Sequence, residues 1–304
     1  IMIDQNSKIY IAGHNGMVGS ATGRKLKKEG FNNLIFKTSK ELDLRNQSLV
    51  DQFIIEEKPD LIIDAAAIVG GIWANNEYPF QFLMDNMQIQ NNLINAAVKN
   101  KIENFIFLGS SCIYPRDAQQ PLKEEYLLTS SLENTNQWYA LAKITGVKLI
   151  EAARKVYGYN YVSLMPTNLY GPNDNFDLKN SHVLPALLRK FHEAKIQNSE
   201  VIIWGSGTPK REFLYVDDLA EAIFYFILNP AKESLYNIGS ERELTIKELG
   251  ELIKNIIDFK GDIKFDSSYP DGTPRKLLDT SKVSSLGWSP KTSLEEGIKL
   301  VYKE

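Results

Sequence analysis

The stretch KIYIAGHNGMVG, residues 8–19, decides the fold of this chain. Its first five residues form a short β-rich run, three regularly spaced glycines follow, and a helical pattern then continues from Ser20 to Glu29. Glycines between a strand and a helix permit a tight turn and a close approach of the backbone to phosphate. A glycine-rich turn that binds nothing is the simpler alternative, but its place in the first strand–helix unit favours nucleotide binding. A pyrophosphate would rest on N–H groups at the helix start, and we expect contacts from Gly13, His14, Asn15, Gly16, Met17, Val18 and Gly19.

The rest of the first half alternates short apolar runs with helical patterns. Strands are expected at 33–37, 61–63, 105–108 and 161–165, and helices at 43–57, 75–100 and 137–157. Strands that are apolar throughout and alternate with helices are typical of a parallel sheet covered on both faces. The sequence therefore predicts an α/β fold with a Rossmann-type, doubly wound parallel sheet.

The second half predicts a smaller unit. A loop composition rich in Asn, Asp, Pro and Gly follows at 166–180, with later helices expected at 183–194, 216–228 and 245–257 and strands at 201–204 and 234–238. Residues 263–265 and 293–302 would complete the smaller C-terminal unit. We expect residues 1–168 to form a nucleotide-binding domain, to which residues 213–240 return. Residues 169–212 and 241–304 would form an α/β substrate domain.

Composition excludes several classes of function. The 304 residues are 43% hydrophobic and 24% charged, as in ordinary globular proteins. A net charge of −3 gives no electrostatic case for nucleic-acid binding, and no apolar run approaches the ~20 residues of a membrane span. Residues 1–8 show no signal-peptide core, and a single cysteine fits a reducing compartment. We expect a cytoplasmic protein that uses no metal and binds neither membrane nor nucleic acid.

The end of the second strand indicates which dinucleotide is bound. An acidic residue there favours NAD through the ribose hydroxyls, whereas a basic residue accommodates the 2′-phosphate of NADP. This chain has Lys37-Thr38-Ser39-Lys40 at that place, with Glu41 only afterwards. The lysines are also explicable as solvated surface charges, but the absence of an acid at the strand end favours NADP(H). We expect Lys37, Ser39 and Lys40 to be among the cofactor contacts.

Three polar residues then suggest a site that reduces ketones. Ser110 follows the expected strand at 105–108, and Tyr139 and Lys143 stand four residues apart, on one helix face. An ammonium favours the phenolate and would make Tyr139 easier to ionise, while Ser110 would hydrogen-bond the same carbonyl oxygen. Most Tyr-x-x-x-Lys pairs are surface neighbours, but here the pair lies downstream of a phosphate loop and a strand end.

The glycine turn, the serine and Tyr-x-x-x-Lys, in this order, resemble the extended short-chain dehydrogenase/reductase superfamily. Longer strings narrow the resemblance to the GDP-L-fucose synthase family: residues 11–20, 69–76, 108–115, 165–172, 180–183 and 270–276. The resemblance implies a homodimer that epimerises GDP-4-keto-6-deoxy-D-mannose at C3 and C5 and then reduces its C4 ketone with NADPH. It also implies that Cys112 and His182 exchange the protons, although a buried cysteine and a loop histidine need no such role.

The same resemblance implies further contacts. Tyr139 is the general acid, Lys143 supports it and contacts the nicotinamide ribose, and Ser110 positions the ketone. The remaining cofactor contacts implied are Leu108, Gly109, Ser111, Pro166, Thr167, Asn168, Leu169 and His182. Residues implied to hold GDP are Lys190, Trp204, Arg211 and Asp271, of which Trp204 would equally suit a core strand.

Two alternatives remain from the sequence. The same chemistry would serve a related GDP-4-keto sugar, either a dideoxy sugar or a 6-deoxy-heptose. A non-catalytic nucleotide-binding scaffold on the same fold is the other, because fold does not fix function. The presence of all five reactive side chains argues against the scaffold.

Overall fold

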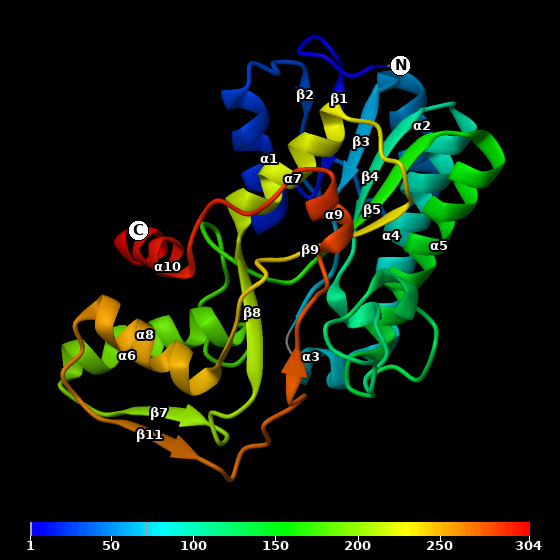
Figure 1. The fold of residues 1–304 in the computed structure, drawn as a ribbon. Helices are drawn as coiled ribbons and strands as arrows, with labels where there is room; N and C mark the ends of the chain where they lie inside the picture. Colours follow the sequence, from blue (N-terminus) through cyan, green and yellow to red (C-terminus); the bar gives the residue numbers. More distant parts are fainter. Residues whose placement is uncertain (1, 71) are drawn as a thin grey trace.

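Six parallel strands form the central sheet of the structure, a computed structural model that describes residues 2–70 and 72–304. The strand order is β2-β1-β3-β4-β5-β9, and every neighbouring pair is parallel. The strands are β1 (Ile9–Ala12), β2 (Leu34–Ile35), β3 (Leu61–Asp64), β4 (Asn104–Leu108), β5 (Asn160–Pro166) and β9 (Leu235–Ile238). The predicted doubly wound α/β fold is confirmed (Figure 1).

Helices cover both faces of this sheet because successive strand residues point to opposite sides. One face packs against α1 (Met17–Lys28) and α7 (Val216–Leu228), and the other against α2 (Gln47–Glu57), α4 (Pro79–Lys99) and α5 (Gln137–Tyr157) (Figure 1). Each layer has its own apolar core. The carboxyl ends of the strands are the place where ligands bind in such sheets.

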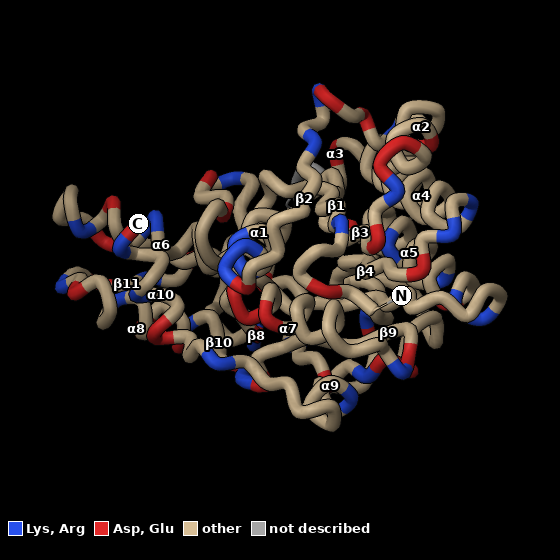
Figure 2. The backbone as a smooth tube through the Cα atoms, turned by 90° about the horizontal axis from the view of Figure 1, so that it is seen from above, with Lys and Arg blue, Asp and Glu red and all other residues tan. Residues whose placement is uncertain are grey.

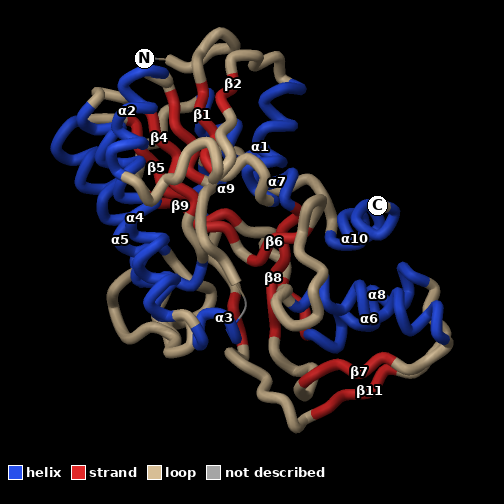
Figure 3. The backbone as a smooth tube through the Cα atoms, turned by 180° about the vertical axis from the view of Figure 1, so that it is seen from behind, coloured by secondary structure: helices blue, strands red, loops and turns tan. Residues whose placement is uncertain are grey.

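A second, smaller unit carries its own core between a sheet and three helices (Figure 3). β8 (Lys210–Tyr215) pairs with β10 (Glu243–Thr245), β12 (Arg275–Lys276) and β6 (Asn168–Tyr170). A separate pair joins β7 (Val201–Trp204) to β11 (Ile263–Asp266). The helices are α6 (Val183–Gln197), α8 (Ile246–Ile257) and α10 (Leu294–Lys303). The domain bounds remain a prediction, because β8 spans the boundary at residue 213.

Three local expectations are corrected. The helix expected at 75–100 is wrong as one piece: α3 (Ile72–Glu77) ends before Pro79, which begins α4 at a position where proline fits. The first helix begins at Met17 rather than Ser20, so the glycine turn runs directly into it. Strands β6, β8, β10 and β12 were not expected from the sequence. Gly71, in one of the strings that carry the resemblance, lies outside the described residues.

Charged residues of both signs occur in both parts of the molecule (Figure 2), and the net charge is only −3. In the part of the chain that the structure describes, no helix combines the length and apolar composition needed to cross a bilayer.

Candidate active site

The glycine turn between β1 and α1 has no room for side chains at two of its positions. Gly13 has a φ of +79°, and a Cβ there would stand 2.6 Å from the Ala65 carbonyl oxygen. A Cβ on Gly19 would stand 2.0 Å from the Gly13 carbonyl oxygen. The turn closes through a Gly16 N–H donated to the Gly13 oxygen at 3.1 Å. The backbone therefore forms a bare cradle at the α1 N-terminus, which suits a pyrophosphate.

The loop after β2 presents cations rather than an acid. Lys37 is half-buried, and Ser39 and Lys40 are exposed. The Glu41 carboxylate turns back onto the loop, where it accepts the Thr38 N–H at 2.7 Å, and this hydrogen bond lowers the pKa of Glu41. This Glu41 oxygen therefore already has a hydrogen-bond donor from within its own loop. The arrangement fits the 2′-phosphate of NADP better than a free ribose hydroxyl.

Ser110 directly follows the carboxyl end of β4, and Lys143 brings the Tyr139 helix face to the same strand end. Ser110 follows Leu108 and Gly109 and caps the short helix η1 (Ser111–Ile113), where its Oγ accepts the Cys112 N–H at 3.4 Å. Lys143 comes from α5, is 4% exposed, and donates from Nζ to the Leu108 carbonyl oxygen at 2.9 Å. The same Nζ lies 5.6 Å from the centroid of the Tyr139 ring.

One electrostatic expectation about this cluster is wrong. Burial raises the pKa of Tyr139, with smaller contributions from Cys112 and Asp64 in the same direction. The expected acidification by Lys143 does not prevail, because burial of the phenol dominates its pKa. Tyr139 therefore holds its proton at neutral pH, as a general acid must before it acts.

Cys112 and His182 come from different units and interact with one common ammonium. Burial raises the pKa of the half-buried Cys112 thiol, against the lowering effect of Lys276 in β12. His182 precedes α6 and keeps exposed surface, yet the protein around it desolvates the ring and lowers its pKa, and Lys276 lowers it further. Lys276 itself has a lowered pKa, chiefly through burial.

Lys276 is the site residue that sequence reasoning missed. It stands in the matched string at 270–276, but nothing in its local pattern assigns it a role. The pairing of β12 with β8, together with the Leu122 N–H donated to the Leu277 carbonyl at 2.7 Å, fixes the position of this lysine, which lies far along the chain from Cys112.

The segment from Pro166 to Leu169 links the two units beside this cluster. Pro166 ends β5, the buried Thr167 donates its N–H to the Ile238 carbonyl at 3.0 Å, and Asn168 begins β6. The Asn168 side chain donates to the Glu212 carbonyl at 3.2 Å. The segment predicted to pass the cofactor is therefore held by backbone contacts to both sheets.

The four residues expected to hold GDP all belong to the second unit, and two of them, Lys190 and Trp204, contact each other. Trp204 is 49% exposed, so the core alternative is wrong; its ring stacks on Tyr269 at 4.4 Å, and Lys190 Nζ lies 4.1 Å from its centroid. Asp271 accepts the Ser206 N–H at 2.6 Å. Arg211 donates to the Thr273 carbonyl at 2.6 Å. A half-exposed aromatic ring beside a lysine, with an arginine in the same unit, suits a nucleoside diphosphate.

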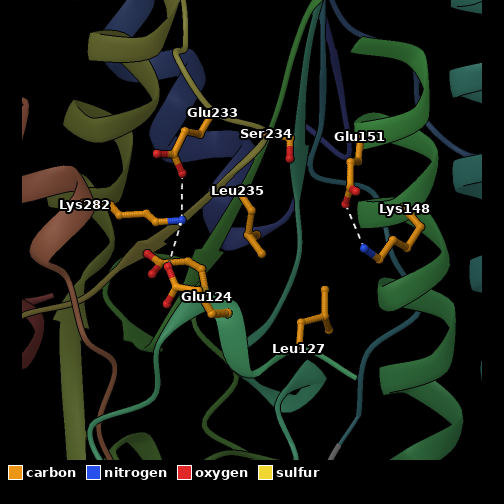
Figure 4. A pocket seen from close by; sticks show the side chains of 9 residues that line it. Glu124, Leu127, Lys148, Glu151, Glu233, Ser234, Leu235 and Lys282 are labelled. Atoms are coloured by element: carbon orange, nitrogen blue, oxygen red, sulfur yellow. Dashed lines mark hydrogen bonds and ion pairs between the residues drawn. The ribbon is translucent and has the colours of Figure 1, made fainter. Parts of the chain in front are cut away.

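A separate pocket lies between η2 (Glu124–Tyr126), α5 and the start of β9 (Figure 4). Lys282 reaches into it and pairs with Glu233 at 2.7 Å. Its carboxylates outnumber its ammonium groups and none of its lining residues is a predicted site residue, so it does not suit a diphosphate. Among the described residues, no cluster of His, Cys, Asp or Glu is arranged to hold a metal ion.

Comparisons with known proteins agree with this geometry. The model of the NAD dependent epimerase/dehydratase family matches residues 9–239. The chain is 54% identical to GDP-L-fucose synthase 1 of Arabidopsis thaliana, covering 99% of this chain and 94% of that protein. It is 49% identical to GDP-L-fucose synthase of Escherichia coli, and the match covers 97% of this chain and 95% of that protein. The solved structure of a GDP-mannoheptose C4 reductase from Campylobacter jejuni with NADP bound is 40% identical in sequence and superposes with a TM-score of 0.91. The match covers 99% of this chain and 98% of that chain.

Proposed function

The chain belongs to the NAD dependent epimerase/dehydratase family, and we propose that it converts GDP-4-keto-6-deoxy-D-mannose to GDP-L-fucose with NADPH. The observation that carries this proposal is the likeness, at about half identity over nearly the whole chain, to GDP-L-fucose synthases. The local geometry supports it, because Lys143 and Cys112 lie at the end of β4, and Lys276 acts on both Cys112 and His182.

Reduction at C4 depends on three side chains at the end of β4. The cofactor is NADP(H), which when bound supplies hydride to the ketone carbon. The Ser110 hydroxyl donates a hydrogen bond to the ketone oxygen, and Tyr139 gives that oxygen its proton. Lys143 then stabilises the phenolate that remains, since an ammonium within about 6 Å favours the charged form. Its Nζ lies 5.6 Å from the Tyr139 ring centroid.

Epimerisation at C3 and C5 needs one group that takes a proton and one that returns it. The C4 ketone acidifies the hydrogens on both carbons, so a modest base suffices. The raised pKa of Cys112 keeps the thiol protonated at neutral pH, and the lowered pKa of His182 keeps the imidazole neutral. The pair therefore begins with one proton donor and one acceptor, which is the state that inversion requires.

The nucleotide half of the substrate is assigned to the second unit. Arg211 presents a guanidinium for bidentate contact with the diphosphate, and Lys190 adds a second positive charge beside Trp204. The half-exposed aromatic pair of Trp204 and Tyr269 provides an apolar surface for the base. Asp271, fixed by Ser206, is the remaining polar contact.

A second candidate substrate is a GDP-4-keto heptose, favoured by the likeness to the solved heptose reductase. The two sugars differ beyond C5, whereas the contacts assigned above hold the nucleotide and the reacting carbons. Relative kcat/KM on the two keto sugars distinguishes them, and a higher value on the heptose would replace the first assignment.

The test of the main proposal is a coupled assay. Freshly prepared product of GDP-mannose dehydratase is mixed with the protein and NADPH, and loss of NADPH absorbance is followed while the sugar formed is identified. We expect oxidation of NADPH with GDP-L-fucose as product. Persistent NADPH with an intact keto sugar would refute the assignment.

The protein is further proposed to be a homodimer that acts in the cytoplasm. Phe80 and Met84 on α4 are 68% and 41% exposed and stand one turn apart, and Leu141 of the adjoining α5 is 39% exposed. An apolar patch on two neighbouring helices suits a second copy of the same surface. A reducing compartment would keep the Cys112 thiol available for its assigned role. Light scattering on Phe80→Glu, which should yield monomer, tests the dimer.

A further inference from the structure

Asp64 is a buried carboxyl that no step above uses. It ends β3, is 1% exposed, and lies level with Phe107 of β4 and Ala12 of β1 in the parallel register. Since side chains alternate along a strand, Asp64 shares a face with Ile62, which packs in the core beneath α4 and α5. Phe107 belongs to the same core. The carboxyl therefore points to the sheet face that α5 covers.

The Lys143 side chain extends from α5 toward the same face of the sheet. Its Nζ lies 5.0 Å from the centroid of the Phe107 ring, one strand away from Asp64, while it donates to the Leu108 carbonyl. The one hydrogen bond given for the Asp64 carboxylate is from the Ala66 N–H to Oδ1 at 3.1 Å. Among the described residues, nothing donates to its buried Oδ2. Two buried, oppositely charged groups thus face one another across Phe107.

The pKa shifts of Asp64 and of Lys143 both agree with this arrangement. Burial raises the pKa of Asp64 to about 6, and Lys143 acts in the opposite direction. Burial lowers the pKa of Lys143, and Asp64 is the largest influence that opposes it. The other ionisable groups that feel or face this pair are Tyr10 of β1, Tyr139 of α5 and Cys112 of η1. All three have raised pKa values and stay neutral near pH 7.

We propose that Asp64 is a positioning residue of the active site, whose carboxylate is the counter-charge that keeps the Lys143 ammonium charged. A lysine that is 4% exposed and hydrogen-bonded to one carbonyl is prone to lose its proton. Lys143 must be charged to stabilise the Tyr139 phenolate in the role assigned above. Asp64 supplies that charge without contacting substrate, from behind the strand ends.

The test is a pH profile of Asp64→Asn and rests, for its activity arm, on the proposed function. The rate of NADPH oxidation with saturating keto sugar and the Kd for NADPH alone are both measured from pH 6 to pH 9.5. Loss of an opposite charge at short range shifts a pKa by about 1 unit or more. We expect the alkaline decline in rate and in affinity to move down by about 1 pH unit, with near-normal values at pH 6.

Two matched variants separate this role from a structural one. Asp218→Asn removes another buried carboxylate, which accepts the Thr292 N–H at 2.9 Å in a region remote from α5, and should leave the alkaline limb in place. In a Lys143→Met background, Asp64→Asn should change neither the rate nor the pH profile further. Asp64→Ser provides a second neutral side chain if the Asn variant does not fold.

An alkaline limb that coincides with wild type, or a loss of equal size at every pH, would overturn the proposal. The proposal would also be overturned if Asp64→Asn lowered the rate in the Lys143→Met background by as much as it does in wild type. The NADPH-binding arm needs no sugar. A wild-type protein without turnover would therefore count against the proposed function, whereas an unshifted binding profile would count against Asp64.

Discussion

Replacing Asp64 with Asn should stabilise the protein at alkaline pH and not at acid pH. The carboxyl is 1% exposed, and its pKa of about 6 stands above the ordinary value of 3.8. Each pKa unit corresponds to about 1.4 kcal/mol, so ionising Asp64 costs the fold about 3 kcal/mol in all. Because the folded pKa is raised, the contribution of this carboxyl to stability is full at low pH and is lost as the pH rises through about 6.

The expected size can be stated for an accessible pH range. Between pH 5 and pH 8 the linkage relation gives a loss of about 1.4 kcal/mol in wild type that Asp64→Asn escapes. Unfolding entropy of about 2 cal per mole per kelvin per residue converts this to about 2 °C for a chain of 304 residues. Thermal unfolding of both proteins at pH 5 and pH 8 should therefore show their Tm difference changing by about 2 °C in favour of the variant.

Asp117→Asn is the control for this measurement, since it removes a carboxylate whose side chain is 74% exposed. Its Tm curve should run parallel to that of wild type. A Tm difference between wild type and Asp64→Asn that stays constant from pH 5 to pH 8 would refute the reasoning, because the carboxyl would then ionise without cost. If the cost is real, the fold gives up stability to keep a charge beside Lys143, a trade known at active sites.

Four further perturbations have defined outcomes. Gly19→Ala places a Cβ 2.0 Å from the Gly13 oxygen and should raise the Kd for NADPH at least about tenfold in a fluorescence titration, with the far-ultraviolet circular dichroism unchanged. Trp204→Ala removes a half-exposed aromatic ring and should raise KM for the keto sugar by about tenfold while kcat holds. Cys112→Ser should slow solvent-proton exchange into the sugar by about 10²–10⁴-fold and leave NADPH binding intact. Glu212→Ala leaves three backbone N–H groups without the carboxylate that accepts their hydrogen bonds. Urea unfolding should show that the free energy of unfolding falls by about 3 kcal/mol or more.

The first sheet could be predicted from the sequence because its strands are uniformly apolar. Runs such as Leu61–Ile63 have no other stable place than a sheet covered on both faces. The glycine turn could also be predicted from the sequence, since the strand before it and the helix after it are local features. Local pattern and global fold agree in this half of the chain.

The second sheet escaped prediction because its strands carry charge. β8 begins Lys-Arg-Glu, and these residues suggested ligand contacts rather than a strand; Glu212 is buried only because it accepts N–H groups from distant loops. Lys276 and Asp64 were missed for a related reason. Their roles depend on neighbours brought together by strand pairing, which no short-range pattern contains.

The acidity of Tyr139 was misjudged because spacing alone fixes too little. Four residues of separation place Tyr139 and Lys143 on one helix face, as expected. The direction of the ammonium, toward the Leu108 carbonyl, and the burial of the phenol depend on the packing of α5 against β4.

The most direct test of the central claim is a single conversion run in heavy water. GDP-4-keto-6-deoxy-D-mannose and NADPH are incubated with the protein in deuterium oxide, and the product is analysed by nuclear magnetic resonance. Two proton exchanges and one reduction at the same site predict GDP-L-fucose with deuterium at C3 and C5 and hydrogen at C4. A reduced sugar that retains hydrogen at C3 and C5 would contradict the account.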